Sequence, residues 1–499
     1  MGSEKVIPII EEAHKNGKKI AIWGMSEKIV FLLNELENKA IYCDFLIDEN
    51  PKKYYSKSGR IYTSIEFDKV RNDVDIIIPT SLSVTKVIRK SIKTTDRIDI
   101  IELKNTEVHF YNLEIYCGGF QIGFSEKGGI QENSEVFHFE YNENIKLDID
   151  KIALLLFVCI GSYYEKVFLD FSIYEETLSK IRSFSKSEVF ANIIPGNRQH
   201  VFSPLNRRKT MINFSGGFDS LAASCVMDKE TTELVSVDWG GGFSREERFF
   251  RKFHPSIVKT DARNKMNIGN MSASFMGIGS IIYAEYLHCN RYTFGTIMEA
   301  IPINFRPIKP ALLEDVKPFN MFNLKRDYFI RGLTEIGTVM IVAKCVPELV
   351  QESLESLGKE GSEKRYRKET LLEIVCEKYS FQVPFRKTSI PEKKVPWGYT
   401  FPLDFLCLYI IKNRGIKEAE KLYSYIPQEA ISFVEKRSLR FYERYNTELI
   451  GKNTFENESD KENYLLRLKE CKIFPYDEDD FREFREVGDF LNIYHNIWK

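Results

Sequence analysis

The stretch that decides the fold of this chain is MINFSGGFDSLAASCVM, residues 211–227. It predicts a short apolar strand, a tight polar turn and then a helix made largely of small residues. The turn holds two adjacent glycines, which allow a sharp bend and a close approach of an anion because neither carries a Cβ. The amides that begin the next helix have no intrahelical partner and lie at the positive end of the helix dipole. The stretch therefore predicts a backbone cradle for phosphate or pyrophosphate.

The turn itself reads SGGFDS, residues 215–220. It resembles the SGGxDS signature of the PP-loop ATP pyrophosphatases, also called the adenine nucleotide α-hydrolase-like superfamily, and it matches at every fixed position. The resemblance implies an α/β fold with a PP-loop (HUP-type) doubly wound parallel sheet. It also implies an enzyme that cleaves ATP between the α- and β-phosphates, with ATP and Mg²⁺ as cofactors. The alternative is an ordinary Gly-Gly turn capped by serine and aspartate, which is a common start of a helix.

The resemblance assigns roles to the side chains of this turn. Ser215, Asp219 and Ser220 are the candidate catalytic residues, the two serines as hydroxyl donors to phosphate. Asp219 is also the candidate for orienting a magnesium ion through water. No GK[ST] follows the glycines, so the turn is not a Walker loop.

Two later predicted strands end near the same site. Val237 and Asp238 close the apolar stretch 233–239, where members of the superfamily bind adenine through backbone groups. Gly295 and Thr296 follow the predicted strand 291–294, and ligands of doubly wound sheets bind at the carboxyl ends of strands. The predicted nucleotide-binding residues are Ser215, Gly216, Gly217, Phe218, Asp219, Ser220, Val237, Asp238, Gly295 and Thr296. Glu299, which comes shortly after, is either part of the site or an ordinary acid at a helix start.

Composition limits the class of protein. A chain of 499 residues, 43% hydrophobic and 29% charged, is long enough for two or three folded domains. The net charge of -1 gives no support for a nucleic-acid partner. The longest apolar run, 153–160, is too short to span a bilayer, and acidic residues interrupt the N-terminus where a signal peptide would lie. We therefore expect a cytoplasmic protein without a membrane partner.

Nine cysteines are scattered along the chain, and none forms a CxxC motif. The seven histidines show neither HxxxH nor HExxH spacing. These patterns predict reduced, mostly buried thiols and no structural metal site.

The first hundred residues predict a small parallel sheet of Rossmann type. The expected elements are a strand at 19–23, a turn at 24–26, a helix at 27–36 and strands at 41–47 and 75–79. The pattern also resembles the nucleotide-sugar-binding domain of sugar O-acyltransferases, which would place Asp48 on a ribose hydroxyl. However, Gly24 alone stands where the dinucleotide fingerprint needs three glycines, so a domain that binds no nucleotide and serves assembly or a protein partner is the favoured alternative.

The rest of the chain predicts three further regions after a Rossmann-like domain at 1–100. They are a mixed β/α region at 101–195, the PP-loop domain at 196–390 and a helical region at 391–499 packed on it. Within the second region, 152–170 predicts a buried helix with a break near Gly161. Within the third, the basic run KRYRK at 364–368 is typical of a solvated helix face.

A further set of cations lies in a proline-rich connection, where they would meet leaving pyrophosphate or simply be solvated. They are Arg306, Lys309 and Lys317.

These observations together favour an AMP-forming ligase that adenylates a substrate oxygen ahead of attack by ammonia or an amine. The absence of clustered cysteines and of a cysteine after the initiator methionine leaves zinc-free, 7-cyano-7-deazaguanine-synthase-like members as the nearest resemblance. The expected partner is a small-molecule acceptor, with a homo-oligomer or a protein partner as a role for the N-terminal domain. The alternatives are an ATP-binding sensor or interaction protein without synthesis and an RNA-modifying adenylating enzyme.

Overall fold

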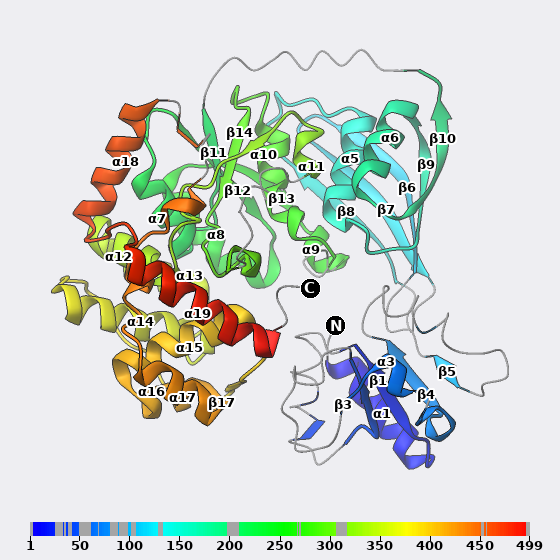
Figure 1. The fold of residues 1–499 in the computed structure, drawn as a ribbon. Coiled ribbons are helices and arrows are strands. Elements are labelled where there is room, and N and C mark those ends of the chain that lie inside the picture. The colour runs from blue at the N-terminus through cyan, green and yellow to red at the C-terminus, as the bar shows by residue number, and fades with distance from the viewer. Residues whose placement is uncertain are drawn as a thin grey trace.

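The computed structural model shows an α/β protein with a five-stranded parallel sheet and a ten-stranded mixed sheet (Figure 1). It describes residues 3–24, 33, 36–37, 42–48, 61–67, 69–79, 88, 98–100, 106–127, 133–196, 209–266, 268, 271–305, 317–450, 454–455 and 457–495. No helix within these ranges is long and apolar enough to cross a membrane.

The five-stranded sheet is N-terminal and has the order β3-β2-β1-β4-β5, with every neighbouring pair parallel. Its elements are α1 (Ser3–Lys15), β1 (Ile20–Trp23), β2 (Phe45–Ile47), β3 (Ile61–Tyr62), α3 (Ser64–Phe67), η1 (Arg71–Asp73), β4 (Ile76–Pro79) and β5 (Asp99–Ile100). The three predicted strands are confirmed, the second in shorter form. The predicted turn at 24–26 and helix at 27–36 lie largely outside the described residues.

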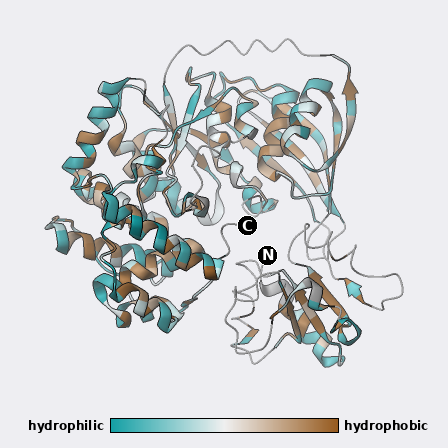
Figure 2. Cartoon of the chain, viewed as in Figure 1, coloured by the Kyte–Doolittle hydropathy of each residue, from teal (hydrophilic) through white to brown (hydrophobic). Residues whose placement is uncertain are grey.

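The central strand β1 shows why this sheet forms. Its residues alternate between two apolar clusters: Ile20 and Ile22 pack with α1, whereas Ala21 and Trp23 pack with Phe67 of α3. A parallel strand that is buried on both faces reads as a continuous apolar run, which is what IAIW is. Figure 2 accordingly shows the strands of this sheet mostly in brown.

The ten-stranded sheet has the order β10-β9-β6-β7-β8-β13-β12-β11-β14-β15. Its first half comes from β6 (Glu107–Tyr116), β7 (Gly119–Lys127), β8 (Asn133–Glu140), α5 (Ile149–Ile160), β9 (Lys166–Tyr174), α6 (Glu175–Phe184) and β10 (Glu188–Ile194). Strand β8 pairs antiparallel with β13, so this region continues the central sheet without a break.

The predicted break near Gly161 is confirmed, but the residues after it form a strand rather than a continuation of the predicted helix. Helix α5 ends at Gly161, whose φ of 59° is easy for glycine and stops the helix. The residues 166–174 then form strand β9, because their aromatic and β-branched side chains suit a pleated, half-buried surface.

The second half of this sheet holds the predicted phosphate loop. Its elements are β11 (Thr210–Asn213), α7 (Phe218–Val226), β12 (Thr232–Asp238), η2 (Gly241–Phe243), α8 (Ser244–Phe250), η3 (Arg251–Phe253), β13 (Ser256–Thr260), α9 (Ala262–Lys265), η5 (Ala273–Gly277), α10 (Ile278–Tyr283), β14 (Arg291–Phe294), η6 (Pro302–Phe305), α11 (Lys317–Asn320) and β15 (Lys325–Arg326). The strands β13, β12, β11, β14 and β15 are neighbours in that order and are all parallel. Strand β11 is therefore central, and the chain leaves it toward β12 first and reaches β14 later.

Helices of the C-terminal region gather on one side of the central sheet, in yellow to red in Figure 1. They are α12 (Glu335–Cys345), η8 (Pro347–Leu349), α13 (Val350–Leu357), α14 (Glu363–Tyr379), α15 (Phe401–Arg414), α16 (Ile416–Leu422), α17 (Gln428–Glu435), η9 (Arg440–Glu443), η10 (Thr447–Leu449), α18 (Glu458–Glu470) and α19 (Glu478–His495), with a small sheet of β16 (Val395–Pro396) and β17 (Tyr423–Tyr425). Ile212 of β11 packs into the core that these helices share with α7, whereas Met211 faces a second core formed with α5 and α10. Both faces of the central strand are thus covered, as its apolar sequence requires.

Candidate functional site

The predicted phosphate loop lies where the sequence places it, between the central strand β11 and helix α7. Its two serines interact with each other, since the Oγ atoms of Ser215 and Ser220 are 3.3 Å apart. The amide of Gly217 donates to Ser215 Oγ at 3.3 Å, and the hydroxyl of Ser220 donates to the carbonyl of Gly217 at 3.1 Å. These bonds preform a compact loop with both hydroxyls inside one turn.

The loop needs glycine at two points. Gly216 has a φ of 78°, and a Cβ there would lie 2.6 Å from the ring of Phe249. Gly295, which follows β14, lies against the start of α7, because a Cβ on it would be 2.5 Å from the amide nitrogen of Ser220. The structure therefore brings Gly295 and the loop together, although 75 residues separate them in the sequence.

The amides of the first turn of α7 face this junction. Phe218, Asp219 and Ser220 have no carbonyl partner within the helix, because each would need a residue four positions earlier in helical conformation. The N-cap residue is Gly217, which has no side chain to cap them. A nine-residue helix with its positive end at a glycine-lined turn has the donors and the dipole that an anion requires.

The two residues predicted at the adenine edge end the neighbouring strand β12. Asp238 is buried, and its carboxylate accepts the amide of Gly240 at 2.9 Å, so it shapes the following glycine turn. Val237 pairs with Val258 of β13 in the parallel register. Asn264 holds the same turn by donating to the carbonyl of Trp239 at 2.8 Å.

Thr296 follows Gly295 and accepts a hydrogen bond from the guanidinium of Arg326, at the end of β15, over 2.8 Å. The same guanidinium lies over the rings of Phe294 and Tyr328, 5.0 Å and 4.9 Å from their centroids. The guanidinium of Arg326 is thus held at the carboxyl ends of β14 and β15. The loop begins at the same edge of the sheet, at the carboxyl end of β11. Of the other candidate cations, Arg306 and Lys309 and the side chain of Lys317 lie outside the described residues.

Asp219 is held by two residues of the helices behind it. The hydroxyl of Thr338 in α12 donates to Asp219 Oδ1 at 2.7 Å, and Lys368 Nζ in α14 lies 3.7 Å from the same oxygen. The Lys368 ammonium also lies 5.1 Å above the ring of Phe218. The side chain of Asp219 remains 34% exposed, so its second oxygen can still meet a ligand or water.

The prediction that the basic run 364–368 forms a solvated face is wrong. Arg365, Arg367 and Lys368 are all buried in α14. Arg365 pairs with the fully buried Glu369, its Nε being 2.9 Å from Oε1. These cations therefore belong to the interior beside the loop, where long charged side chains occur only when they are paired.

Glu335 is the common partner of two of these cations. Its carboxylate lies 2.9 Å from Nη1 of Arg367 and 2.9 Å from Nζ of Lys368, and Arg367 also pairs with Glu363 at 2.7 Å. Burial by itself disfavours the charged carboxylate, but the two adjacent cations outweigh it and lower the pKa of Glu335 to about 2. The result is a fixed chain of charges that runs from Glu363 through Arg367, Glu335 and Lys368 to the loop.

Glu299 is fully buried at the edge of this network. Its Oε1 accepts the amide of Glu335 at 2.8 Å, which caps α12 from outside that helix. Its Oε2 has no hydrogen-bond partner in the part of the chain that the structure describes. Burial, and then the nearby carboxylate of Glu335, raise the pKa of Glu299 to about 8. The sequence predicts Glu299 to be either a site residue or an ordinary acid at a helix start. The structure favours the second alternative, with the difference that Glu299 caps α12, which begins 36 residues later.

The sequence contained a signal for this network that the basic run obscured. Glu363 and Arg367, and likewise Arg365 and Glu369, stand four residues apart with opposite charge, which places each pair on one helical face. The contact between Thr338 and Asp219 had no such local signal, because 119 residues separate the two.

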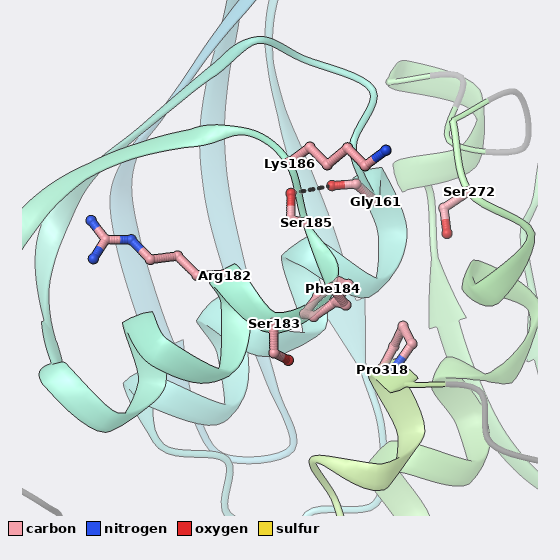
Figure 3. Close-up of a pocket in the computed structure, with 8 residues that line it drawn as sticks. All are labelled: Gly161, Arg182, Ser183, Phe184, Ser185, Lys186, Ser272 and Pro318. Atoms are coloured by element: carbon pink, nitrogen blue, oxygen red, sulfur yellow. Dashed lines mark hydrogen bonds between the residues drawn. The ribbon is translucent and has the colours of Figure 1, made fainter.

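A pocket of about 540 Å³ lies elsewhere, between the ends of α5 and α6 and the residues Ser272 and Pro318 (Figure 3). Ser185 within it donates to the carbonyl of Gly161 at 2.9 Å. Figure 3 shows the side chain of Arg182 pointing away from Ser272 and Pro318. None of the predicted site residues lines this pocket.

The loop fits magnesium only together with a nucleotide. No group of three or more His, Cys, Asp or Glu side chains that could hold a metal ion occurs in the described ranges. Magnesium in nucleotide sites is commonly held by one or two carboxylates together with phosphates and waters. The exposed oxygen of Asp219 is compatible with that role.

No protein-family model, no curated protein and no solved structure matches this chain. The candidate site is therefore judged on its geometry.

Proposed function

We propose that this chain is an AMP-forming, ATP-dependent ligase of the PP-loop type, with a HUP-like doubly wound central sheet. The observation that carries the proposal is the uncapped first turn of α7, which meets Gly295 where a Cβ would lie 2.5 Å from Ser220 N. The strand order is a second support. The chain leaves β11 toward opposite sides of the sheet, and ligands of open α/β sheets bind at such switch points.

In this proposal the β- and γ-phosphates of ATP bind the amides of residues 216–220 and the hydroxyls of Ser215 and Ser220. The adenine lies against the backbone of Val237 and Asp238, and Gly295 and Thr296 border the phosphates. A Mg²⁺ ion between the phosphates would offset their charge, with Asp219 orienting it through water. Arg326, which Thr296 holds in place, is a fixed cation at the strand end.

The chemistry divides into two steps. An oxygen of the acceptor, for example a carboxylate, attacks the α-phosphorus and forms an acyl adenylate, while the bond to the β-phosphate breaks and pyrophosphate leaves. The amides at the N-terminus of α7 and the two serine hydroxyls receive the charge that develops on the leaving group. Ammonia or an amine then attacks the acyl carbon, and AMP leaves with the acceptor's original oxygen. A carboxylate acceptor needs no general base in the first step.

The test is to measure AMP and pyrophosphate release from ATP and Mg²⁺ with a panel of carboxylates, with and without ammonia. We expect equimolar AMP and pyrophosphate with at least one acceptor. Release of ADP and phosphate, or ATP binding without turnover across a broad panel, would contradict the proposal.

The second candidate function is an ATP-binding sensor without synthesis. Asp219 supports this alternative, because Thr338 donates a hydrogen bond to it and Lys368 lies beside it. These contacts would also stabilise a loop that binds ATP without catalysing a reaction. Tight ATP binding without AMP formation would favour this alternative. For the N-terminal sheet, which we propose to be Rossmann-like, a role in assembly or in binding a protein partner remains favoured over nucleotide-sugar binding.

A further inference from the structure

Three cysteines that are far apart in the sequence converge at one point. Cys345 ends α12, Cys225 lies in the last turn of α7, and Cys471 follows α18 directly. The sulfur atoms of Cys345 and Cys471 are 3.6 Å apart. Cys225 also forms a side-chain hydrogen bond with Cys345. All three thiols are free, as are the other six in the chain.

The three thiols are not equivalent. Cys345 is exposed, Cys225 is half-buried and Cys471 is buried. The hydrogen bonds with Cys225 and Cys471, together with the ammonium of Lys344, hold the pKa of the Cys345 thiol below its usual range. The same hydrogen bonds and burial raise the pKa of the other two thiols. An exposed thiol in contact with two less exposed thiols and with a lowered pKa has the features of a reactive cysteine.

We propose that Cys345 is a hydroperoxide-reactive cysteine and that Cys471 resolves it into a disulfide. The Cys345 thiolate attacks one oxygen of hydrogen peroxide, the O–O bond breaks, and the departing hydroxide takes a solvent proton to become water. Cys471 then loses its proton and attacks the sulfenic sulfur of Cys345, and a second water leaves. Two thiols are oxidised to one disulfide while one hydrogen peroxide is reduced to two waters.

The surroundings favour Cys471 over Cys225 as the resolving thiol. A disulfide requires the two sulfurs to approach to about 2.0 Å, so one side must move. Cys225 lies within the last turn of α7, whereas Cys345 ends α12 and Cys471 lies one residue beyond the end of α18. Cys471 is packed in the same core as α7, but it follows an outer helix at the margin of the molecule (Figure 1), where Leu466 is 55% exposed. The resulting bond would join α18 to the helix that holds Thr338 and Glu335, at the opposite end from those residues.

The experiment treats the full chain with hydrogen peroxide, blocks the remaining thiols, digests without reduction and identifies linked peptides by mass spectrometry. We expect a peptide pair joined through Cys345 and Cys471, and consumption of the Cys345 thiol at least about tenfold faster than that of Cys117. Cys117 is the matched control, because it is also exposed and its thiol donates only to a carbonyl, that of Glu143 at 3.6 Å.

Two variants complete the test. In Cys471→Ser, the sulfenic acid on Cys345 should persist and be trapped by dimedone, whereas Cys345→Ser should abolish both the adduct and the disulfide. Circular dichroism of each variant verifies that it is folded, and Cys345→Ala serves as a second variant if the serine form is not. Equal reaction rates of Cys345 and Cys117, or a disulfide from Cys345 to Cys225, would overturn the assignment. The outcome is independent of the proposed ATP chemistry.

Discussion

The chain contains two five-stranded parallel arrays with the same strand order. In the N-terminal array the order is β3-β2-β1-β4-β5, and in the central array it is β13-β12-β11-β14-β15. In both, the first strand in sequence is central and buries alternate residues in two apolar clusters. Topology alone would therefore place a ligand at the end of either first strand.

The two arrays differ in what they bury near that point. Among the described residues of the first hundred, no polar or charged side chain is buried, whereas Glu299, Glu335, Arg367 and Lys368 are buried beside the central loop. Buried charges are costly unless they are paired and hydrogen-bonded, and a core built only for stability uses apolar side chains. If our proposal holds, strand order decides where a ligand can bind, while glycines and buried charges decide whether one does.

The largest expected effect tests the role of Asp219. Replacing Asp219 with Ala should lower AMP formation by about 100-fold or more, because the orienting carboxylate at the loop is lost. The fold should persist, since Lys368 keeps Glu335 as a partner at 2.9 Å. Asp228→Ala is the control, because Asp228 is exposed just beyond the other end of α7. Unchanged turnover in the Asp219 variant would remove this residue from the mechanism.

A smaller effect is expected at Gly295. In Gly295→Ala the new methyl group would meet the amide of Ser220 and push the start of α7 away from β14. ATP affinity measured by calorimetry should weaken by about tenfold or more, which corresponds to about 1.4 kcal/mol. Gly242→Ala is the matched control, since no atom lies within 4 Å of a Cβ at that position. Equal affinities of the two variants would show that the close approach does not matter for binding.

The buried Glu299 in the central array predicts a dependence of stability on pH. Its folded-state pKa is raised from 4.5 to about 8, so its contribution to stability is fully present below pH 4.5 and is lost as the pH rises toward 8. The side chain in Glu299→Gln is neutral at every pH, so the variant should show no such loss of stability. The free energy of unfolding of the variant relative to the native chain should therefore rise between these pH values, by at most about 1.4 kcal/mol per pH unit. If the difference in free energy of unfolding between the variant and the native chain does not change with pH, Glu299 is not the group that titrates.

The smallest effect is expected at Asp48, which follows β2 in the N-terminal array. Asp48→Asn should leave ATP affinity within about twofold of the native value, because one glycine in the first turn is too few for a pyrophosphate to approach. Calorimetric titration of ATP provides the measurement. A tenfold loss of affinity would show that the N-terminal array binds the nucleotide, and the contrast between the arrays would fail.

Local sequence was sufficient where burial and turn chemistry act over a few residues. Strand β14 coincides with the predicted range 291–294, and the loop 215–220 lies between a strand and a helix as its glycines require. Local sequence failed at 166–174, where an apolar run suits either a buried helix or a buried strand. It failed again at Arg367 and Lys368, because a basic run looks solvated until the acids that pair with it are placed.

The sequence by itself determined most of the strands and the position of the predicted phosphate loop, because apolar periodicity and glycine conformations are properties of neighbouring residues. Only the tertiary structure decided that Thr338 and Lys368 hold Asp219, that Gly295 touches Ser220, and that Cys225, Cys345 and Cys471 meet. It also joined the middle region to the central sheet through the pairing of β8 with β13. These contacts connect residues more than 70 positions apart, and their energy depends on how helices pack across a sheet rather than on any pattern along the chain.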